Sequence, residues 1–156
     1  MGDSFDANRD AVRKLYRYVI HDGAVPDLFL RKYCYHTRRR LDAAAMREAT
    51  RVLVGTHDFH SFETEWPNRA SSVRTITHLG LSRFGDWLWL DVEADGFLYN
   101  MVRAIAGTLI NVGRGYWPVT QVADLRRIGE PSMSSEIDGP RKRSDGAAES
   151  ETAARA

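Results

Sequence analysis

The feature that most restricts the fold of this sequence is the apolar segment at residues 96–113, GFLYNMVRAIAGTLINVG, which begins and ends with glycine. Phe97, Met101 and Ile105 recur in it at the spacing that places side chains on one face of an α-helix. Arg103 is the only charged residue of the segment. The pattern predicts a helix that is buried in a packed core, so other elements of the chain must cover it.

The segments before this helix alternate in the manner of β-strands. Residues 14–20, KLYRYVI, place Tyr16 and Tyr18 on one face of a first strand. Residues 73–83 and 86–94 predict two further strands that a short turn connects. Three strands are therefore available to pack against the apolar helix.

Two more helices are predicted. One follows the basic run Arg38, Arg39 and Arg40; Asp42 is suited to its N-cap, and Gly55 can terminate it. Its apolar stripe consists of Ala45, Met46, Ala49, Val52 and Leu53. A shorter helix is predicted over residues 120–128, and a loop is predicted around the sequences HDFHSF and EWPN.

The order strand, helix, strand, strand, helix predicts an α+β fold. We expect a mixed or antiparallel sheet flanked by helices, the β-α-β-β-α part of a ferredoxin-like unit without its last strand. A sheet short of that strand has an unpaired edge. We expect one domain over residues 5–130 and a disordered tail over residues 131–156, where Ser, Ala, Gly and charged residues replace the aromatic ones.

Composition excludes several classes of protein. The net charge of +1 over 156 residues creates no global field, so a nucleic-acid surface would depend on local clusters of arginine. The single cysteine, Cys34, excludes an internal disulfide framework. The N-terminus MGDSFD has no apolar core, and no segment is long enough to cross a bilayer. We therefore expect a cytoplasmic protein.

Arg103 and the two tyrosines are candidates with alternative explanations. A guanidinium keeps its proton, so its burial requires an anionic or hydrogen-bonding partner. Arg103 therefore either binds a functional anion, or it reaches the surface or pairs with a local carboxylate such as Asp95. Tyr16 and Tyr18 either pack in the core or form a stacking platform for an unstacked base.

The remaining candidates carry weaker signals. Arg38, Arg39 and Arg40 either contact RNA phosphates or form a solvated surface. The histidines of the sequence THDFH, residues 56–60, lack a third anchoring ligand, so we expect no metal site. The sequence contains no Gly-rich phosphate loop and no nucleophile elbow, and we expect no cofactor.

Four segments together resemble the tRNA pseudouridine synthase A family, which modifies uridines in the tRNA anticodon stem-loop. They are FDANRDAVRKLYRYVI at residues 5–20, LDAAAMREATRVLVGTHDFHSF at 41–62, VRTITHLGLSR at 73–83 and GFLYNMVRAIAGTLINVGRG at 96–115. Their order and spacing match the family over residues 5–128.

The resemblance implies roles for two residues. Tyr16 occupies the position of the tyrosine that touches the target base, which is flipped out of the RNA. Arg103 occupies the position of the arginine that pairs with the catalytic aspartate. The family needs no metal or organic cofactor, and it acts as a homodimer with tRNA contacting both subunits.

Two family features are absent from this sequence. It contains neither the GRTDxGVHA-type motif that carries the catalytic aspartate nor a final GLYL-like strand. We therefore expect this chain alone to be inactive and to require a separate N-terminal half. We expect the chain to be a truncated or frameshifted gene product, a product of a misassigned start or one half of a split enzyme, and the sequence leaves these alternatives open. The functional alternatives are a non-catalytic tRNA-binding or dimerisation module and a decayed fragment.

Overall fold

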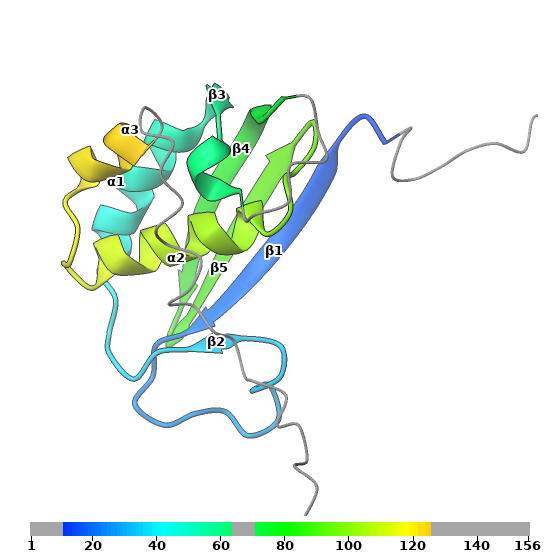
Figure 1. Ribbon diagram of the computed structural model, residues 1–156. Coiled ribbons are helices and arrows are strands. Elements are labelled where there is room, and N and C mark those ends of the chain that lie inside the picture. Colours follow the sequence, from blue (N-terminus) through cyan, green and yellow to red (C-terminus); the bar gives the residue numbers. More distant parts are fainter. Residues whose placement is uncertain (1–10, 64–70, 126–156) are drawn as a thin grey trace, which may run out of the picture.

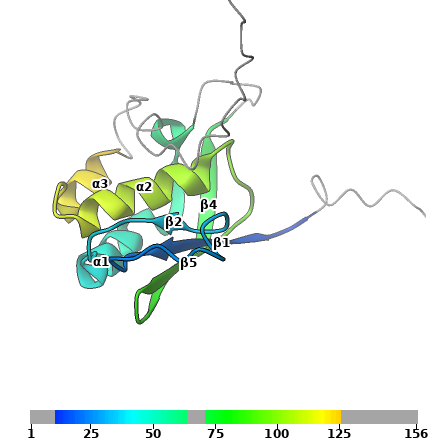
Figure 2. The same cartoon turned by 90° about the horizontal axis from the view of Figure 1, so that it is seen from below.

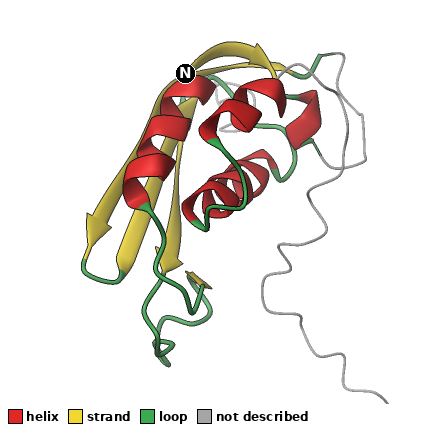
Figure 3. Cartoon of the chain, turned by 90° about the vertical axis from the view of Figure 1, so that its left-hand side faces the viewer, coloured by secondary structure: helices red, strands yellow, loops and turns green. Residues whose placement is uncertain are grey.

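The computed structural model describes residues 11–63 and 71–125, which form a mixed sheet with helices packed on one face (Figures 1 and 3). The elements are, in order, β1 (Lys14–His21), β2 (Tyr35–His36), α1 (Ala43–Leu53), β3 (Gly55–Asp58), the 3-10 helix η1 (His60–Phe62), β4 (Val73–Phe84), β5 (Trp87–Ala94), α2 (Met101–Gly113) and α3 (Val119–Leu125). The predicted α+β class is confirmed.

The strand order is β2-β1-β5-β4-β3, and the three predicted strands are its central members. The pair β1–β2 is parallel, whereas all the other pairs are antiparallel. β2 pairs with β1 only at Ile20 and His21, so within the described part of the chain no strand pairs with residues 14–19 on this edge. Figure 2, viewed from the end where β2 lies, shows α2 and α3 together on one side of β1 and β5.

The core lies between the sheet and the helices. The alternation in β5 buries Leu88, Leu90 and Val92 on the face that α1 and α2 cover. The side chain of Met46 in α1 packs against Gly113 of α2, where an added Cβ atom would lie 2.6 Å from the Met46 sulfur. A side chain at this position would therefore displace the side chain of Met46.

The residue before each of the two longer helices determines where that helix begins. Asp42 caps α1 as predicted, because its carboxylate accepts hydrogen bonds from the backbone N–H groups of Ala44 and Ala45 at 2.9 and 3.0 Å. The predicted start of the apolar helix at residue 96 is wrong. Asn100 has a left-handed backbone with φ of 58°, which cannot continue a right-handed helix, so α2 begins at Met101. Phe97 therefore lies in a loop.

The predicted loop around HDFHSF is wrong in its first part. After α1, Gly55 has a φ of 113° and begins β3. This strand pairs antiparallel with β4. The short strand β2 was not predicted. The last helix covers Val119–Leu125, whereas residues 126–128 of the predicted helix and the predicted tail 131–156 lie outside the described residues.

Candidate functional site

The start of β1 and the segment before α2 bring two aromatic rings together. Tyr16 pairs with Val92 in the sheet register and therefore lies on the helix-covered face. Its ring contacts Phe97 edge to face, with ring centroids 5.0 Å apart and an interplanar angle of 89°. Tyr16 is nevertheless 52% exposed, because β1 extends beyond the cover of α2 at this end. An aromatic surface is therefore held in place but accessible.

Arg103 lies near the second tyrosine of β1. Burial raises the pKa of the Tyr18 hydroxyl above its ordinary value, and the positive charge of Arg103 opposes this rise. Arg103 and Tyr18 are thus close enough to interact electrostatically, although they belong to α2 and β1. The structure brings Tyr16, Tyr18 and Arg103 to the same side of the sheet.

Arg103 reaches the surface, which is one of the alternatives that the sequence left open, because its side chain is exposed on α2. The guanidinium forms no ion pair with a carboxylate among the residues that the structure describes. Asp95, the local partner considered above, instead accepts a hydrogen bond from the backbone N–H of Thr75 at 3.1 Å. A solvated Arg103 is therefore available to an external anion.

A second contact between tyrosine and arginine lies near the C-terminal end of α2. Arg114 donates hydrogen bonds to the Tyr35 hydroxyl at 3.1 Å and to the Thr37 hydroxyl at 3.5 Å. The aromatic and basic side chains therefore continue along α2 as far as β2. Sequence analysis missed Tyr35 and Arg114, because their contact depends on the short parallel strand.

The basic run before α1 divides into two parts. Arg38 and Arg39 are exposed, and Arg39 donates a long hydrogen bond of 3.4 Å to the hydroxyl of Tyr116. Arg40 donates to Asp86 at 2.6 Å and to Asp22 at 3.4 Å. Much of the charge of Arg40 is therefore compensated within the protein, whereas Arg38 and Arg39 face solvent.

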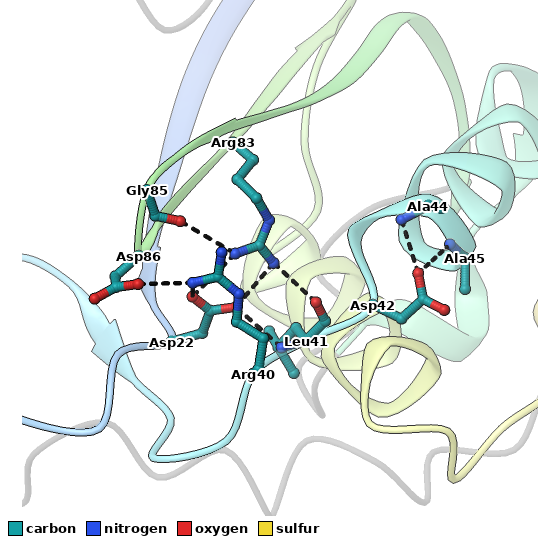
Figure 4. A network of polar contacts seen from close by, with 9 residues as sticks. All are labelled: Asp22, Arg40, Leu41, Asp42, Ala44, Ala45, Arg83, Gly85 and Asp86. Atoms are coloured by element: carbon teal, nitrogen blue, oxygen red, sulfur yellow. Dashed lines mark hydrogen bonds and ion pairs between the residues drawn. The ribbon is translucent and has the colours of Figure 1, made fainter.

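Asp22 is the centre of this polar network (Figure 4). Its side chain is fully buried and accepts two hydrogen bonds from Arg83, at 3.1 and 2.8 Å, and one from the backbone N–H of Leu41 at 2.9 Å. Arg83 also donates to the Leu41 carbonyl at 2.8 Å. The network joins the end of β1 to β4 and to the segment before α1, so Arg40 lies at the opposite end of β1 from Tyr16.

The residues considered as metal ligands have local roles. His57 bonds through Nε2 to the carbonyl of Val54 at 2.9 Å, and Asp58 accepts from the backbone N–H of His60 at 2.9 Å. Among the described residues no three His, Cys, Asp or Glu side chains are grouped so that they could hold a metal ion. Similarly, no helix within those residues is long and apolar enough to span a membrane.

The fold and the site together define the class of protein. It is an α+β domain with a ferredoxin-like core, in which the exposed side chains of Tyr16 on β1 and Arg103 on α2 lie on the same side of the sheet. The sequence profile described as tRNA pseudouridine synthase matches residues 49–139. The chain belongs to the tRNA pseudouridine synthase family.

Curated relatives agree with this assignment. The chain is 49% identical over 115 residues to tRNA pseudouridine synthase A of Bacillus licheniformis, a match that covers 74% of this chain and 47% of the relative. It is 46% identical over 113 residues to that of Bacillus subtilis, covering 72% and 46%. It is 45% identical over 125 residues to tRNA pseudouridine synthase A of Brevibacillus brevis, a match that covers 80% of this chain and 50% of the relative. The chain thus spans about half the length of these relatives.

Proposed function

We propose that this chain supplies the base-contacting tyrosine and the arginine of a tRNA pseudouridine synthase, an isomerase that converts uridine to pseudouridine in the anticodon stem-loop. The observation that carries the proposal is that exposed Arg103 on α2 lies close to Tyr18 on β1, on the same side of the sheet as the exposed ring of Tyr16. Arg103 lies in residues 96–115, the segment whose resemblance to the family is most specific, and the tyrosines lie in the first of the four resembling segments.

Tyr16 is the residue that contacts the target base. Its ring is half exposed and is supported on one side by Phe97. A flipped pyrimidine can stack on or pack against such a ring without reorganising the protein. The extrusion of the base from the RNA costs free energy, and this contact offsets part of that cost.

Arg103 pairs with the catalytic aspartate. A cation beside a carboxylate lowers the pKa of that carboxylate and keeps it ionised and oriented for attack during cleavage of the glycosidic bond. The GRTDxGVHA-type motif is absent from this sequence. In our proposal, a segment outside these 156 residues that carries such a motif supplies the carboxylate.

The tRNA itself is the macromolecular partner. Arg38 and Arg39, which are exposed, are suited to bind its phosphates, whereas Arg40 already pairs with Asp86. By the resemblance to the family, we further propose a homodimer that acts in the cytoplasm. The second candidate function is a non-catalytic tRNA-binding or dimerisation module. It is favoured by the lack of a carboxylate next to Arg103 in the described part of the chain.

The test is pseudouridine formation on an unmodified tRNA anticodon stem-loop. The purified chain is assayed alone and after addition of a polypeptide that carries a GRTDxGVHA-type motif. Turnover only in the second reaction supports the proposed role. Salt-dependent RNA binding without turnover in either reaction favours the non-catalytic module, and absence of both indicates a decayed fragment. Turnover by the chain alone would mean that one of its own carboxylates performs the attack.

A further inference from the structure

The connection between β1 and β2 exposes large apolar side chains. This loop, residues 24–34, extends below the sheet in Figure 1. Phe29 is 92% exposed and Tyr33 is 78% exposed, and the other large apolar residues of the loop that are exposed are Val25, Leu28 and Leu30. Contiguous exposed apolar side chains commonly mark an interaction surface. None of these residues contributes to the site around Tyr16 and Arg103.

The loop has a defined turn. The Asp27 carboxylate accepts hydrogen bonds from the backbone N–H groups of Phe29 and Leu30 at 2.8 and 2.9 Å. The backbone N–H of Tyr33 donates to the Leu30 carbonyl at 2.8 Å. The two exposed aromatic rings are therefore presented by an ordered backbone, and binding through them would cost less conformational entropy than binding through an unstructured loop.

The part of the chain that carries these rings has an excess of positive charge. Residues 24–40 contain five basic residues, Arg31, Lys32, Arg38, Arg39 and Arg40, and one acidic residue, Asp27, whose carboxylate is engaged in the turn. Arg40 pairs with Asp86 and Asp22, so the other four carry the excess. Arg31 and Lys32 lie between Phe29 and Tyr33 and are exposed. Aromatic rings interleaved with solvated cations are the chemistry that binds unpaired nucleotides, since bases stack on the rings and phosphates bind the cations.

The loop also adjoins the candidate site. Burial raises the pKa of the Cys34 thiol, and the charge of Asp27 adds to this rise. The loop ends at Cys34, and the next residue, Tyr35, pairs with Ile20 of β1, two residues after Tyr18. The loop therefore follows Tyr16 and Tyr18 along β1, where an RNA bound at these tyrosines can reach it.

We infer that the β1–β2 loop is a second RNA-contact surface, in which Phe29 and Tyr33 stack on unpaired nucleotides and Arg31 and Lys32 bind the adjoining phosphates. The inference rests on the proposed function, because it assumes that the ligand is the same tRNA. It adds a contact for nucleotides next to the target uridine. Positive charge favours RNA over a second copy of this chain as the occupant.

The experiment measures binding of the full chain to two labelled RNAs by fluorescence anisotropy. One is an unmodified tRNA anticodon stem-loop, and the other is a blunt duplex of the same stem without unpaired nucleotides. The double variant Phe29→Ala/Tyr33→Ala should bind the stem-loop about tenfold or more weakly and bind the duplex as the wild type does. Phe29→Trp retains a stacking surface and should bind normally. Phe84→Ala, which removes another exposed ring on β4, is the matched control and should also bind normally.

Stacking on the rings and binding of phosphates by the cations predict different salt dependences for the aromatic and the basic variants. Arg31→Ala/Lys32→Ala should weaken binding to both RNAs and reduce the salt slope, whereas the aromatic variant should leave the slope unchanged. Equal stem-loop binding by wild type and the aromatic variant would overturn this inference alone. Failure of the wild type to bind any RNA would overturn the proposed function as well. An aromatic variant that changes the oligomeric state, or loses binding to anionic lipid vesicles instead of RNA, would assign the surface to another partner.

Discussion

Tyr16 and Phe97 meet edge to face, 5.0 Å apart, although they are separated by most of the folded sequence and come from β1 and the segment before α2. Phe97 also packs against the core, so it connects the exposed tyrosine to the rigid part of the molecule. The left-handed Asn100 delays the start of α2 and leaves Phe97 in the loop from which it reaches Tyr16. The orientation of the base-contacting ring thus depends on where α2 begins.

This contact should appear as an energetic coupling. In a double-mutant cycle of Tyr16→Ala and Phe97→Ala, we expect a coupling free energy of about 0.5–1.5 kcal/mol in urea unfolding. Phe97 supports Tyr16 and does not itself contact the RNA in our proposal, so Phe97→Ala alone should weaken anticodon stem-loop binding indirectly. Phe97→Tyr retains the ring and should bind normally. Strictly additive stability effects would contradict the supporting role of Phe97.

Arg103 should contribute little to the stability of the isolated chain. It is exposed and has no carboxylate partner in the part of the chain that the structure describes, so Arg103→Ala should change the free energy of unfolding by no more than about 0.5 kcal/mol. Urea denaturation followed by circular dichroism measures this. A loss of several kcal/mol would reveal a partner within this chain and would contradict the proposal that Arg103 awaits an external carboxylate.

Asp22, unlike Arg103, should contribute strongly to the stability of the folded chain. Asp22→Ala removes a buried carboxylate, leaves the Leu41 N–H without its acceptor and leaves the charge of Arg83 without its anionic partner, so we expect a loss of about 3–5 kcal/mol. Asp91→Ala is the matched control, because Asp91 also accepts two hydrogen bonds from one arginine, Arg17, but lies on the more exposed open face of the sheet. The control should lose much less. Similar losses for both variants would show that the network in Figure 4 is not a stabilising centre.

The pair Arg17–Asp91 should give a defined pH dependence. The hydrogen bond from Arg17 holds the pKa of Asp91 below its ordinary value of 3.8. The unfolded chain therefore binds this proton more readily, and the stabilisation is present above pH 3.8 and lost as the pH falls through the lower pKa of the folded state. The stability difference between wild type and Asp91→Asn, measured at low salt, should shrink on acidification. A difference that grows as the pH falls would contradict this sign.

Local sequence patterns were sufficient for most of the fold. The alternation of Leu88, Leu90 and Val92 identified the strand β5, and Asp42 identified the start of α1. The strands β2 and β3 were missed because they are short and have no apolar alternation; they form through pairing with distant residues. Such non-local contacts cannot be read from a local period.

The candidate site was predictable only in part. The position of Arg103 in an apolar segment drew attention to it, but the pattern left open whether it binds an anion or reaches the surface, because its exposure depends on how α2 lies across the sheet. Phe97 looked like a core residue of a helix because its spacing from Met101 is helical. The positive φ of Asn100 separates Phe97 from the helix, and the sequence pattern does not reveal this backbone conformation.

The most direct test of the central claim is pseudouridine formation by the pair of this chain and a polypeptide with the GRTDxGVHA-type motif, compared for wild type, Arg103→Lys and Arg103→Ala. We predict turnover for the wild-type pair and a loss of about 100-fold or more for Arg103→Ala, since a lost charge-assisted contact at the reacting carboxylate costs several kcal/mol in the transition state. Anticodon stem-loop binding should remain within about twofold, because Arg103 acts on the carboxylate and not on the bulk of the RNA. Full turnover by Arg103→Ala, or none by the wild-type pair, would contradict the account.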